Sequence, residues 1–404
     1  MPRPISTHVV ELCSLCHCPP VAIWLATVAA RRDAPVELWL PAEVIDDPTH
    51  AGRLARAEEA DVLVHRVDMP PVEWSAAGRR EAVSWLADWA APRPGDRVLI
   101  PTIDYFLMAD GRIPLPEGTR LDVVFHQPKF QHRPIPPLHD LLRGRLGIGS
   151  RRFGRLEMQR LRAIGPDRVL SLDAHAVLGP GRRRLVRLVG TDQVEFLPSD
   201  INDGTPSPRG IARAWLGIGD TEPLLVVNGM LGPWKDIETL IAAWPQVCSR
   251  VPGARLALVG EVPGLAPDWS AMLGDGMLLR DEIVPDELFL GLVRDADAVW
   301  AVRTTPGGMS TVQFDAFKAG VPCLVSEQHA PTAWLAKRLG GVTITPRRVN
   351  SVAQGVASAI SSSGEIGQRD LGILADADLA GDVILARRRI ALGDLPDQPP
   401  RTAS

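Results

Sequence analysis

One lysine follows a short glycine-containing loop in the middle of the chain, where it could bind a phosphate. The stretch from Leu224 to Ile241 reads LLVVNGMLGPWKDIETLI. Its apolar start predicts a buried parallel strand, and the acids and apolar spacing after Lys235 predict a helix. A helix that begins at the carboxyl end of such a strand directs unpaired N–H groups toward bound ligands. Lys235 could bind a phosphate oxygen there, although a solvated lysine at a helix start gives the same pattern.

A second candidate anion-binding loop lies in residues 301–327, which read AVRTTPGGMSTVQFDAFKAGVPCLVSE. The pattern predicts a strand, a loop with paired glycines, and a helix that begins at Ser310 and stops at Gly320. Backbone N–H groups and two hydroxyls could bind an anion at Gly307, Gly308, Met309, Ser310 and Thr311. Asp315, about one turn further, could accept hydrogen bonds from a ribose diol. This loop and Lys235 would form two walls of one diphosphate site.

A histidine ends one apolar stretch of the N-terminal half. His126 closes the segment LDVVFH, so it would project from the carboxyl edge of a strand into a ligand-binding cleft. There it could donate to a sugar hydroxyl or a phosphate oxygen. The alternative is a histidine that caps its own strand.

A cluster of cysteines near the start has the spacing of a metal or haem motif. Cys13, Cys16, His17 and Cys18 form a C-x-x-C-H pattern. Covalent haem attachment needs an exported chain, and a structural zinc site needs a fourth ligand from a second knuckle, which the sequence does not show. Reduced thiols that line the first loop between a strand and a helix are the preferred interpretation.

Positive charge is concentrated between Arg143 and Arg187. This segment has twelve arginines and only three acids, Glu157, Asp167 and Asp173. Such a face could contact anionic lipid or a phosphorylated acceptor. A solvated arginine-rich surface is the simpler interpretation.

Strands and helices alternate throughout, which predicts two α/β domains with parallel sheets. The helices predicted in the first half include Pro19–Arg31 and Val72–Ala90. A turn-rich segment, Ile201–Pro208 (INDGTPSP), marks the hinge between the domains. The predicted strands are His8–Leu12, Val36–Leu40, Val62–Val67, Arg97–Pro101, Asp122–His126, Arg168–Leu172, Val194–Pro198, Leu224–Asn228, Arg255–Val259, Gly276–Leu279, Ala298–Val302, Pro322–Ser326 and Val342–Thr345.

The composition is that of an ordinary globular protein. Of the 404 residues, 45% are hydrophobic and 23% are charged, which is enough for two domains with their own cores. The net charge of -4 gives no reason to expect nucleic acid, and no apolar run approaches the roughly 20 residues of a membrane span. Five cysteines and the absence of a visible secretory signal favour a cytoplasmic location.

The order of these motifs from about Val194 to Ile360 resembles glycosyltransferase family 4, a large retaining and metal-independent class with the GT-B fold. The segment VVNGMLGPWKDIETLI resembles the family's G-R-x-x-x-x-K loop, and RLALVGEVPG resembles the next strand and its glycine turn. The segment LLRDEIVPDELFLGLVRDADAVWAV resembles the base-binding segment, and MSTVQFDAFKAGVPCLVSE resembles the nucleotide-sugar helix.

The resemblance implies two facing Rossmann-like, doubly wound domains with a cleft between them. Residues 1–203 would bind the acceptor, and a helix at about 376–392 would pack back on that domain. Residues 204–375 would bind the donor, a nucleoside-diphosphate sugar that serves as co-substrate. No other cofactor is implied, and no metal, because the cleft loops show no D-x-D-like pair. The acceptor could be a small molecule, a glycan or a lipid-linked compound, with peripheral membrane contact through residues 143–187.

The resemblance also assigns roles. Lys235, preceded by Gly229, would hold the donor diphosphate, Ile283 and Val284 the base, and Asp315 the ribose. His126 would be the cleft histidine, and residues 307–311 would bind phosphate and sugar through their amides.

The chain departs from the family pattern at three places. Met230 replaces the loop arginine, Gly307 replaces the first glutamate of the E-x7-E pair, and LCHCPP replaces a glycine-rich turn near the start. Arg303 is a candidate replacement for the missing cation. These changes leave a GT-B epimerase or phosphorylase, or a non-catalytic nucleotide-sugar-binding or partner protein, as alternatives.

Overall fold

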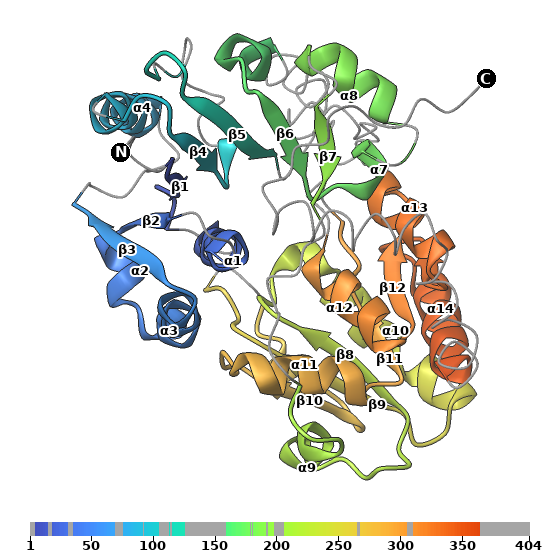
Figure 1. Cartoon of the computed structure of the whole chain (residues 1–404). Coiled ribbons are helices and arrows are strands. Elements are labelled where there is room, and N and C mark those ends of the chain that lie inside the picture. Colours follow the sequence, from blue (N-terminus) through green and yellow to red (C-terminus); the bar gives the residue numbers. More distant parts are fainter. Residues whose placement is uncertain are drawn as a thin grey trace. The chain divides into compact units, whose positions relative to one another are not determined.

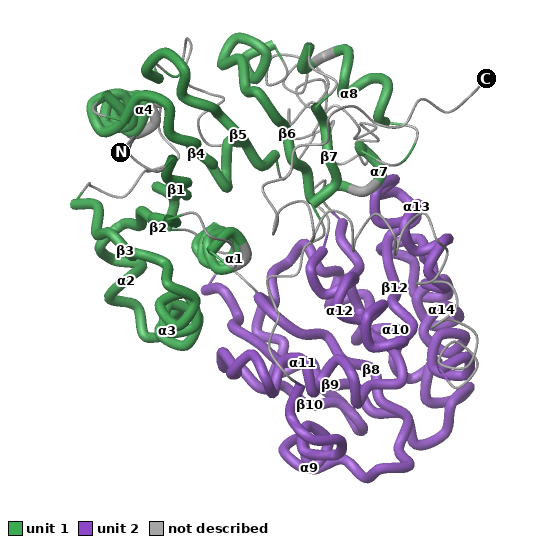
Figure 2. The backbone as a smooth tube through the Cα atoms, viewed as in Figure 1, with its two compact units in different colours: residues 1–201, 381–404 green, residues 202–380 purple. Residues whose placement is uncertain are grey.

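The chain forms two compact units in the computed structural model (Figure 2). Described residues up to Leu197 belong to unit 1, and those from Pro206 onward belong to unit 2. The structure describes residues 5–14, 18–30, 35–68, 76–91, 93–104, 113, 115–125, 159–177, 179, 181–190, 193–197, 206–264, 267–304 and 310–363.

Unit 1 is built on a seven-stranded sheet in the order β3-β2-β1-β4-β5-β6-β7 (Figure 1). Every pair of neighbouring strands is parallel. The strand order reverses direction between β1 and β4, which is the kind of position where open α/β sheets bind ligands. The strands are β1 (Thr7–Val10), β2 (Val36–Pro41), β3 (Val62–Val67), β4 (Arg97–Ile100), β5 (Arg120–Phe125), β6 (Arg168–Ser171) and β7 (Val194–Phe196).

Helix α1 forms the centre of the unit 1 core. Its sequence, CPPVAIWLATVAA, is apolar all round, as expected for a helix that is covered on most sides. Val21 and Leu25 of α1 pack with Val36 and Leu38 of β2. The helices of unit 1 are α1 (Cys18–Ala30), α2 (Ala42–Asp46), η1 (Pro48–His50), α3 (Ala51–Glu59), α4 (Ala76–Ala90), α7 (Ala174–Val177) and α8 (Arg182–Val189).

Unit 2 is built on a six-stranded sheet in the order β10-β9-β8-β11-β12-β13, again entirely parallel. Its strands are β8 (Leu224–Asn228), β9 (Arg255–Val259), β10 (Met277–Arg280), β11 (Ala298–Trp300), β12 (Cys323–Ser326) and β13 (Val342–Ile344). Its helices are α9 (Ile211–Leu216), η4 (Pro233–Lys235), α10 (Ile237–Arg250), η5 (Ser270–Met272), α11 (Asp286–Asp295), α12 (Thr311–Ala319), α13 (Ala330–Arg338) and α14 (Val349–Ser361).

Helices cover both faces of the central strand β8. Leu225 and Val227 of β8 join a buried cluster with Trp244 of α10 and Val352 of α14. Successive side chains of a strand point to opposite faces, so Val226 and Asn228 lie on the other face. Helix α11 packs against β8 on that side, and α12 packs beside α11.

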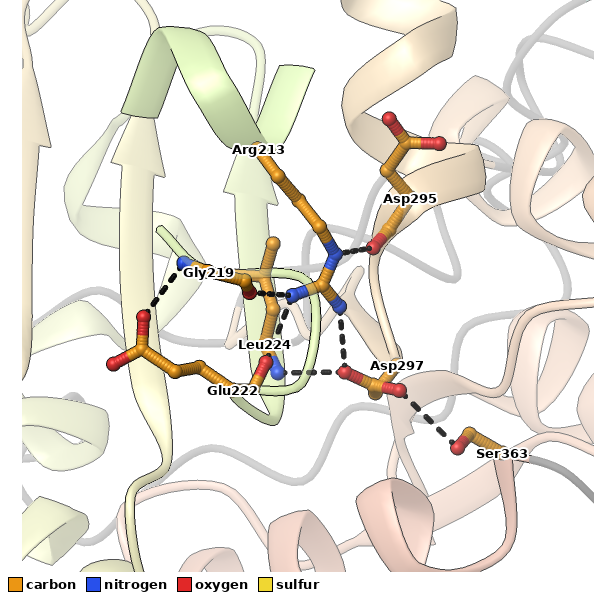
Figure 3. Close-up of polar contacts among 7 residues, drawn as sticks. All are labelled: Arg213, Gly219, Glu222, Leu224, Asp295, Asp297 and Ser363. Carbon is orange, nitrogen blue, oxygen red and sulfur yellow. Dashed lines mark hydrogen bonds and ion pairs between the residues drawn. The ribbon is translucent and has the colours of Figure 1, made fainter. Parts of the chain in front are cut away.

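Arg213 ties the first helix of unit 2 to the amino ends of two strands (Figure 3). Its guanidinium donates to the carbonyls of Asp295, Gly219 and Glu222 at 2.9, 3.0 and 2.8 Å. It also pairs with the Asp297 carboxylate at 2.9 Å, and that carboxylate accepts the Leu224 N–H at 2.8 Å. The start of α9 is thereby fixed to the entries of β8 and β11.

All thirteen predicted strands are present, with ends within two residues of the prediction. The predicted helix at 19–31 corresponds to α1, and the predicted helix from Ser310 to Gly320 corresponds to α12. The predicted helix at 72–90 is described from Ala76 onward. The C-terminal helix expected at about 376–392 lies outside the described residues.

Candidate functional site

The loop from Gly229 to Asp236 follows β8 and is fixed to both neighbouring strands. The Leu231 N–H donates to the Glu261 carbonyl after β9 at 2.8 Å. The Trp300 indole of β11 donates to the Lys235 carbonyl at 2.7 Å. The loop backbone is therefore held in a defined path at the carboxyl edge of the sheet.

Two glycines allow this path. Gly229 has a φ of +78°, and Gly260, after β9, has a φ of +141°. A Cβ on Gly260 would lie 2.3 Å from the Gly229 carbonyl oxygen. Only glycine permits both the backbone conformation and the close approach of these two loops.

Asp236 ends the loop rather than lying inside the helix as expected. It has a φ of +57° and immediately precedes α10. Its buried carboxylate accepts from the Arg347 N–H at 2.7 Å and the Thr239 hydroxyl at 2.8 Å. These bonds support a left-handed conformation that is unusual outside glycine.

Lys235 turns back toward the strand that precedes it. Its half-buried ammonium donates to the Asn228 carbonyl at 2.5 Å. Burial, with a smaller contribution from the nearby charge of Arg303, lowers the pKa of Lys235 to about 7. A lysine with such a pKa changes its charge readily when an anion binds.

Arg303 provides a second cation just after β11, the strand that pairs with β8. Burial lowers the pKa of Arg303 as well. Within the part of the chain that the structure describes, neither Arg303 nor Lys235 forms an ion pair with an acid. Met230, which stands where the resemblance implies an arginine, is 39% exposed.

The described end of the second loop leads into α12. Ser310 is buried at the N-cap position, its side chain makes no cap hydrogen bond, and Thr311 is half-buried. Asp315 is only 3% exposed, and its carboxylate lies 3.3 Å from the Lys318 ammonium. The predicted residues Gly307, Gly308 and Met309 lie outside the described residues.

The two residues expected near the base follow β10 at one edge of the sheet. Ile283 is 66% exposed, and Val284 is half-buried. An exposed isoleucine next to a ligand-binding edge offers an apolar surface for a flat ring. Strand β10 is two strands away from β8 in the sheet.

Fewer of the residues predicted in unit 1 can be placed. His126 lies outside the described residues, as do Cys16 and His17. Cys13 and Cys18 are buried free thiols whose side chains are hydrogen-bonded to each other. Among the residues that the structure describes, no three histidine, cysteine or acidic side chains are grouped to hold a metal.

The arginine-rich segment is only partly a surface. Arg168 lies in the core, where it pairs with Asp122 at 2.9 Å. Arg183 and Arg187 of α8 are exposed. Asp167 and Asp173 are bound to backbone N–H groups at 2.7 and 3.0 Å, so these acids are engaged within the fold. Among the described helices, none has the length and apolarity needed to cross a membrane.

Two buried polar residues were not predicted from the sequence. Glu11, at the carboxyl end of β1, accepts from the Thr102 hydroxyl at 2.6 Å and the Cys13 N–H at 2.9 Å. Burial raises the pKa of Glu11 to about 8. Asn228, the last residue of β8, is fully buried, and neither polar atom of its side-chain amide has a hydrogen-bond partner in the described structure. The sequence signal that could have identified both residues is an acid or amide directly after an apolar strand segment.

The sequence of unit 2 is similar to that of known glycosyltransferases. Residues 222–362 match the family model described as glycosyl transferases group 1. A D-inositol 3-phosphate glycosyltransferase of Segniliparus rotundus is 26% identical over 161 residues, which are 38% of this chain and 36% of the relative. A GDP-mannose-dependent alpha-(1-6)-phosphatidylinositol monomannoside mannosyltransferase of Mycobacterium tuberculosis is 28% identical over 182 residues, 41% of this chain and 46% of the relative. The chain thus spans less than half the length of these relatives.

Solved structures match over nearly the whole chain. HepE of Anabaena, in complex with UDP and glucose, has a TM-score of 0.63 at 15% identity and covers 96% of this chain and 99% of its own. Sucrose-phosphate synthase of Thermosynechococcus elongatus has a TM-score of 0.59 at 16% identity, with 95% and 100% covered. The two parallel α/β units therefore have the GT-B fold. Residues 222–362 are therefore similar to the glycosyl transferases group 1 family, which agrees with the resemblance expected for the second half of the chain.

Proposed function

We propose that the protein is a retaining glycosyltransferase that moves a sugar from a nucleoside-diphosphate sugar to an acceptor hydroxyl without a metal ion. One observation carries this proposal: Lys235 and Arg303 follow neighbouring parallel strands, and neither pairs with an acid in the described structure. Two such cations at the carboxyl edge of a parallel sheet suit a diphosphate.

The chemistry requires mainly that the departing charge be neutralised. The bond between the anomeric carbon and the diphosphate oxygen breaks while the acceptor oxygen bonds to the same carbon. The acceptor proton passes to the departing diphosphate. Positive groups fixed where negative charge develops lower the barrier, and cations in a partly buried site act more strongly than in water. Lys235 and Arg303 would have this role.

The donor class is supported by the relatives. The name of the Mycobacterium tuberculosis relative gives GDP-mannose as its donor, and HepE was solved with UDP and glucose. We place the base beside Ile283 and Val284, and the phosphates between Lys235 and the amides at the start of α12. Asp315 is our candidate ribose ligand, but it would first have to loosen its contact with Lys318.

Unit 1 would hold the acceptor, with His126 as a candidate contact. The names of both sequence relatives include an inositol that carries phosphate, in one of them as part of a lipid. Arg183 and Arg187 could contact an anionic acceptor or an anionic membrane. The proposal therefore includes three kinds of acceptor: a small molecule, a glycan or a lipid-linked compound.

Thermal-shift measurements test the donor site. The purified protein is melted with UDP, GDP, ADP, TDP and their sugar conjugates, with and without magnesium. A ligand that binds only the folded state raises the melting temperature. We expect stabilisation by one base without magnesium, reduced in both Lys235→Ala and Arg303→Ala. Lys337→Ala, which removes an exposed lysine of the same unit, is the matched control.

Two results would count against the proposal. Unchanged nucleotide binding by Lys235→Ala and Arg303→Ala would contradict the assignment of the diphosphate site to these two residues. Donor binding with no transfer to any acceptor would favour the non-catalytic alternative. An epimerase would act without acceptor, and a phosphorylase would release sugar phosphate on addition of inorganic phosphate.

A further inference from the structure

The side-chain amide of Asn228 forms no hydrogen bond within the described part of the chain. The residue ends β8, it is fully buried, and neither Oδ1 nor Nδ2 has a partner among the described residues. Buried polar groups in folded proteins are nearly always bonded, because an unpaired one has given up its bonds to water. An unpaired amide at this edge of a parallel sheet therefore indicates a group that supplies the missing bonds.

The surroundings of Asn228 are those of the proposed donor site. Its backbone carbonyl accepts a hydrogen bond from the Lys235 ammonium, and Gly229 follows directly in the chain. An ideal Cβ on Gly229 would lie 3.8 Å from both the Lys235 ammonium and the Phe289 ring, so glycine leaves that position open. The alternation along β8 directs the amide to the face covered by α11, away from the core formed with α10 and α14.

The hydrogen-bonding groups of a carboxamide indicate which part of the nucleotide-sugar Asn228 could bind. A carboxamide has two donor hydrogens on Nδ2 and an acceptor oxygen, Oδ1. A phosphate only accepts, so it would leave Oδ1 unpaired. A hydroxyl both donates and accepts, so hydroxyl groups can pair both ends of the amide.

The positions proposed for the other parts of the donor favour the transferred sugar, rather than the nucleoside, as the group that Asn228 binds. Strand β10, which leads to Ile283 and Val284, is two strands from β8, whereas the two cations follow β8 and its neighbour β11. The base is placed beside Ile283 and the ribose at Asp315, so the transferred sugar is the hydroxyl-bearing part of the donor that is left to pair with Asn228 beside the phosphates. We propose that Asn228 binds hydroxyl groups of the transferred sugar and helps to determine which donor sugar is used. This inference rests on the proposed function.

Binding measurements separate a sugar contact from other roles. The measured quantity is the ratio of the Kd for the nucleoside diphosphate to the Kd for its sugar conjugate. Asn228→Leu keeps the branching and the number of side-chain heavy atoms but cannot form hydrogen bonds. We expect this variant to lower the ratio by about tenfold, the size of one buried hydrogen bond, and to leave the Kd of the nucleoside diphosphate unchanged.

Donors that lack single hydroxyls identify the contact. For the parent, removal of the bonded hydroxyl weakens binding, whereas for Asn228→Leu the same removal has no further effect. Gln313→Leu is the control, because Gln313 is also a buried amide with an unpaired Oε1, but its Nε2 donates to the Thr332 carbonyl at 2.9 Å and it lies in α12 rather than at the end of β8. This control should keep the parent ratio.

A purely structural role for Asn228 makes a different prediction. Asn228→Leu should then lower the melting temperature without ligand, whereas removal of an unpaired amide should maintain or raise it. Asn228→Ser is a second variant if the leucine variant does not fold. A parent-like ratio in a folded variant overturns the inference, and so does equal weakening of the nucleoside diphosphate and its conjugate. Loss of all nucleotide binding in Lys235→Ala is scored separately, because it tests the proposed function alone.

Discussion

At the scale of the residue, the ionisation of Lys235 should be coupled to donor binding. Burial lowers its pKa from 10.5 to about 7, so at pH 8.5 the amine of the free protein is mostly neutral. The negative diphosphate favours the charged form and raises the pKa. We expect uptake of up to one proton on binding at pH 8.5 and almost none at pH 6. Affinity should therefore fall as pH rises above about 7, by at most about tenfold per pH unit.

Calorimetry can count this proton. Binding heats are compared in two buffers that differ in heat of ionisation, with a nucleoside-diphosphate sugar whose phosphates do not titrate near neutral pH. Lys235→Met should abolish the uptake, and Lys337→Met should retain it. Absence of proton uptake by the parent at pH 8.5 would mean that the diphosphate binds elsewhere.

Charged candidates were easier to single out from the sequence than residues distinguished by an unpaired amide or by a pKa that burial shifts. Lys235 and Arg303 stand out in the sequence because they lie in loops that follow apolar strands. Asn228 and Glu11 also end apolar strands, but a missing hydrogen bond or a pKa raised by burial exists only once the surroundings are built. Asp315 was correctly placed on its helix, but its contact with Lys318 was not anticipated.

At the scale of the element, the contact between the loops after β8 and β9 should control the site. We expect Gly260→Ala to push the Gly229 carbonyl away, because the new Cβ would lie 2.3 Å from its oxygen in a backbone region that alanine avoids. The variant should lose about 2–4 kcal/mol of unfolding free energy and bind nucleotide weakly.

Gly264→Ala is the control for this change. It lies in the same loop, but its added Cβ would meet no atom within 4 Å. Denaturant unfolding and nucleotide titration of both variants provide the comparison. Equal effects of the two substitutions would show that the approach of the loops is unimportant.

The elements themselves were predictable because their signals are local. Short apolar runs such as those of β8 and β9 are typical of strands buried on both faces, and glycine ends α12 as expected. The left-handed Asp236 was missed, since its conformation depends on a bond from Arg347, which is distant in sequence.

At the scale of the whole molecule, Arg213 should stabilise unit 2 without acting on the donor. We expect Arg213→Met to cost about 2–4 kcal/mol, because it leaves Asp297 and three carbonyls without their partner. These groups lie at the amino ends of β8 and β11, opposite the proposed site. Nucleotide affinity below the melting transition should therefore stay close to that of the parent.

Arg255→Met tests whether the loss of any ion pair in unit 2 lowers the unfolding free energy as much as Arg213→Met. Arg255 pairs with Glu222 at 2.6 Å, but both side chains are substantially exposed, so we expect a much smaller loss of unfolding free energy than for Arg213→Met. Thermal unfolding of the two variants should therefore differ clearly. A loss of the same size in both would contradict the role assigned to Arg213.

The two-unit α/β architecture also followed from the sequence, because strands and helices alternate on both sides of a turn-rich segment. The acceptor did not follow from it. In our proposal acceptor choice depends on loops of unit 1, and neither local periodicity nor strand order constrains the side chains that such loops present.

The strand order of unit 2 has a consequence for biosynthesis. Strand β8 pairs with β9 on one side, but its other partner, β11, begins about 70 residues later in the chain. At a synthesis rate of about 5–20 residues per second, one edge of this apolar strand waits roughly 4–14 s for its neighbour. An open edge of this kind can pair with other chains. The nascent protein should therefore depend on chaperones most strongly while the ribosome translates the segment between β9 and β11.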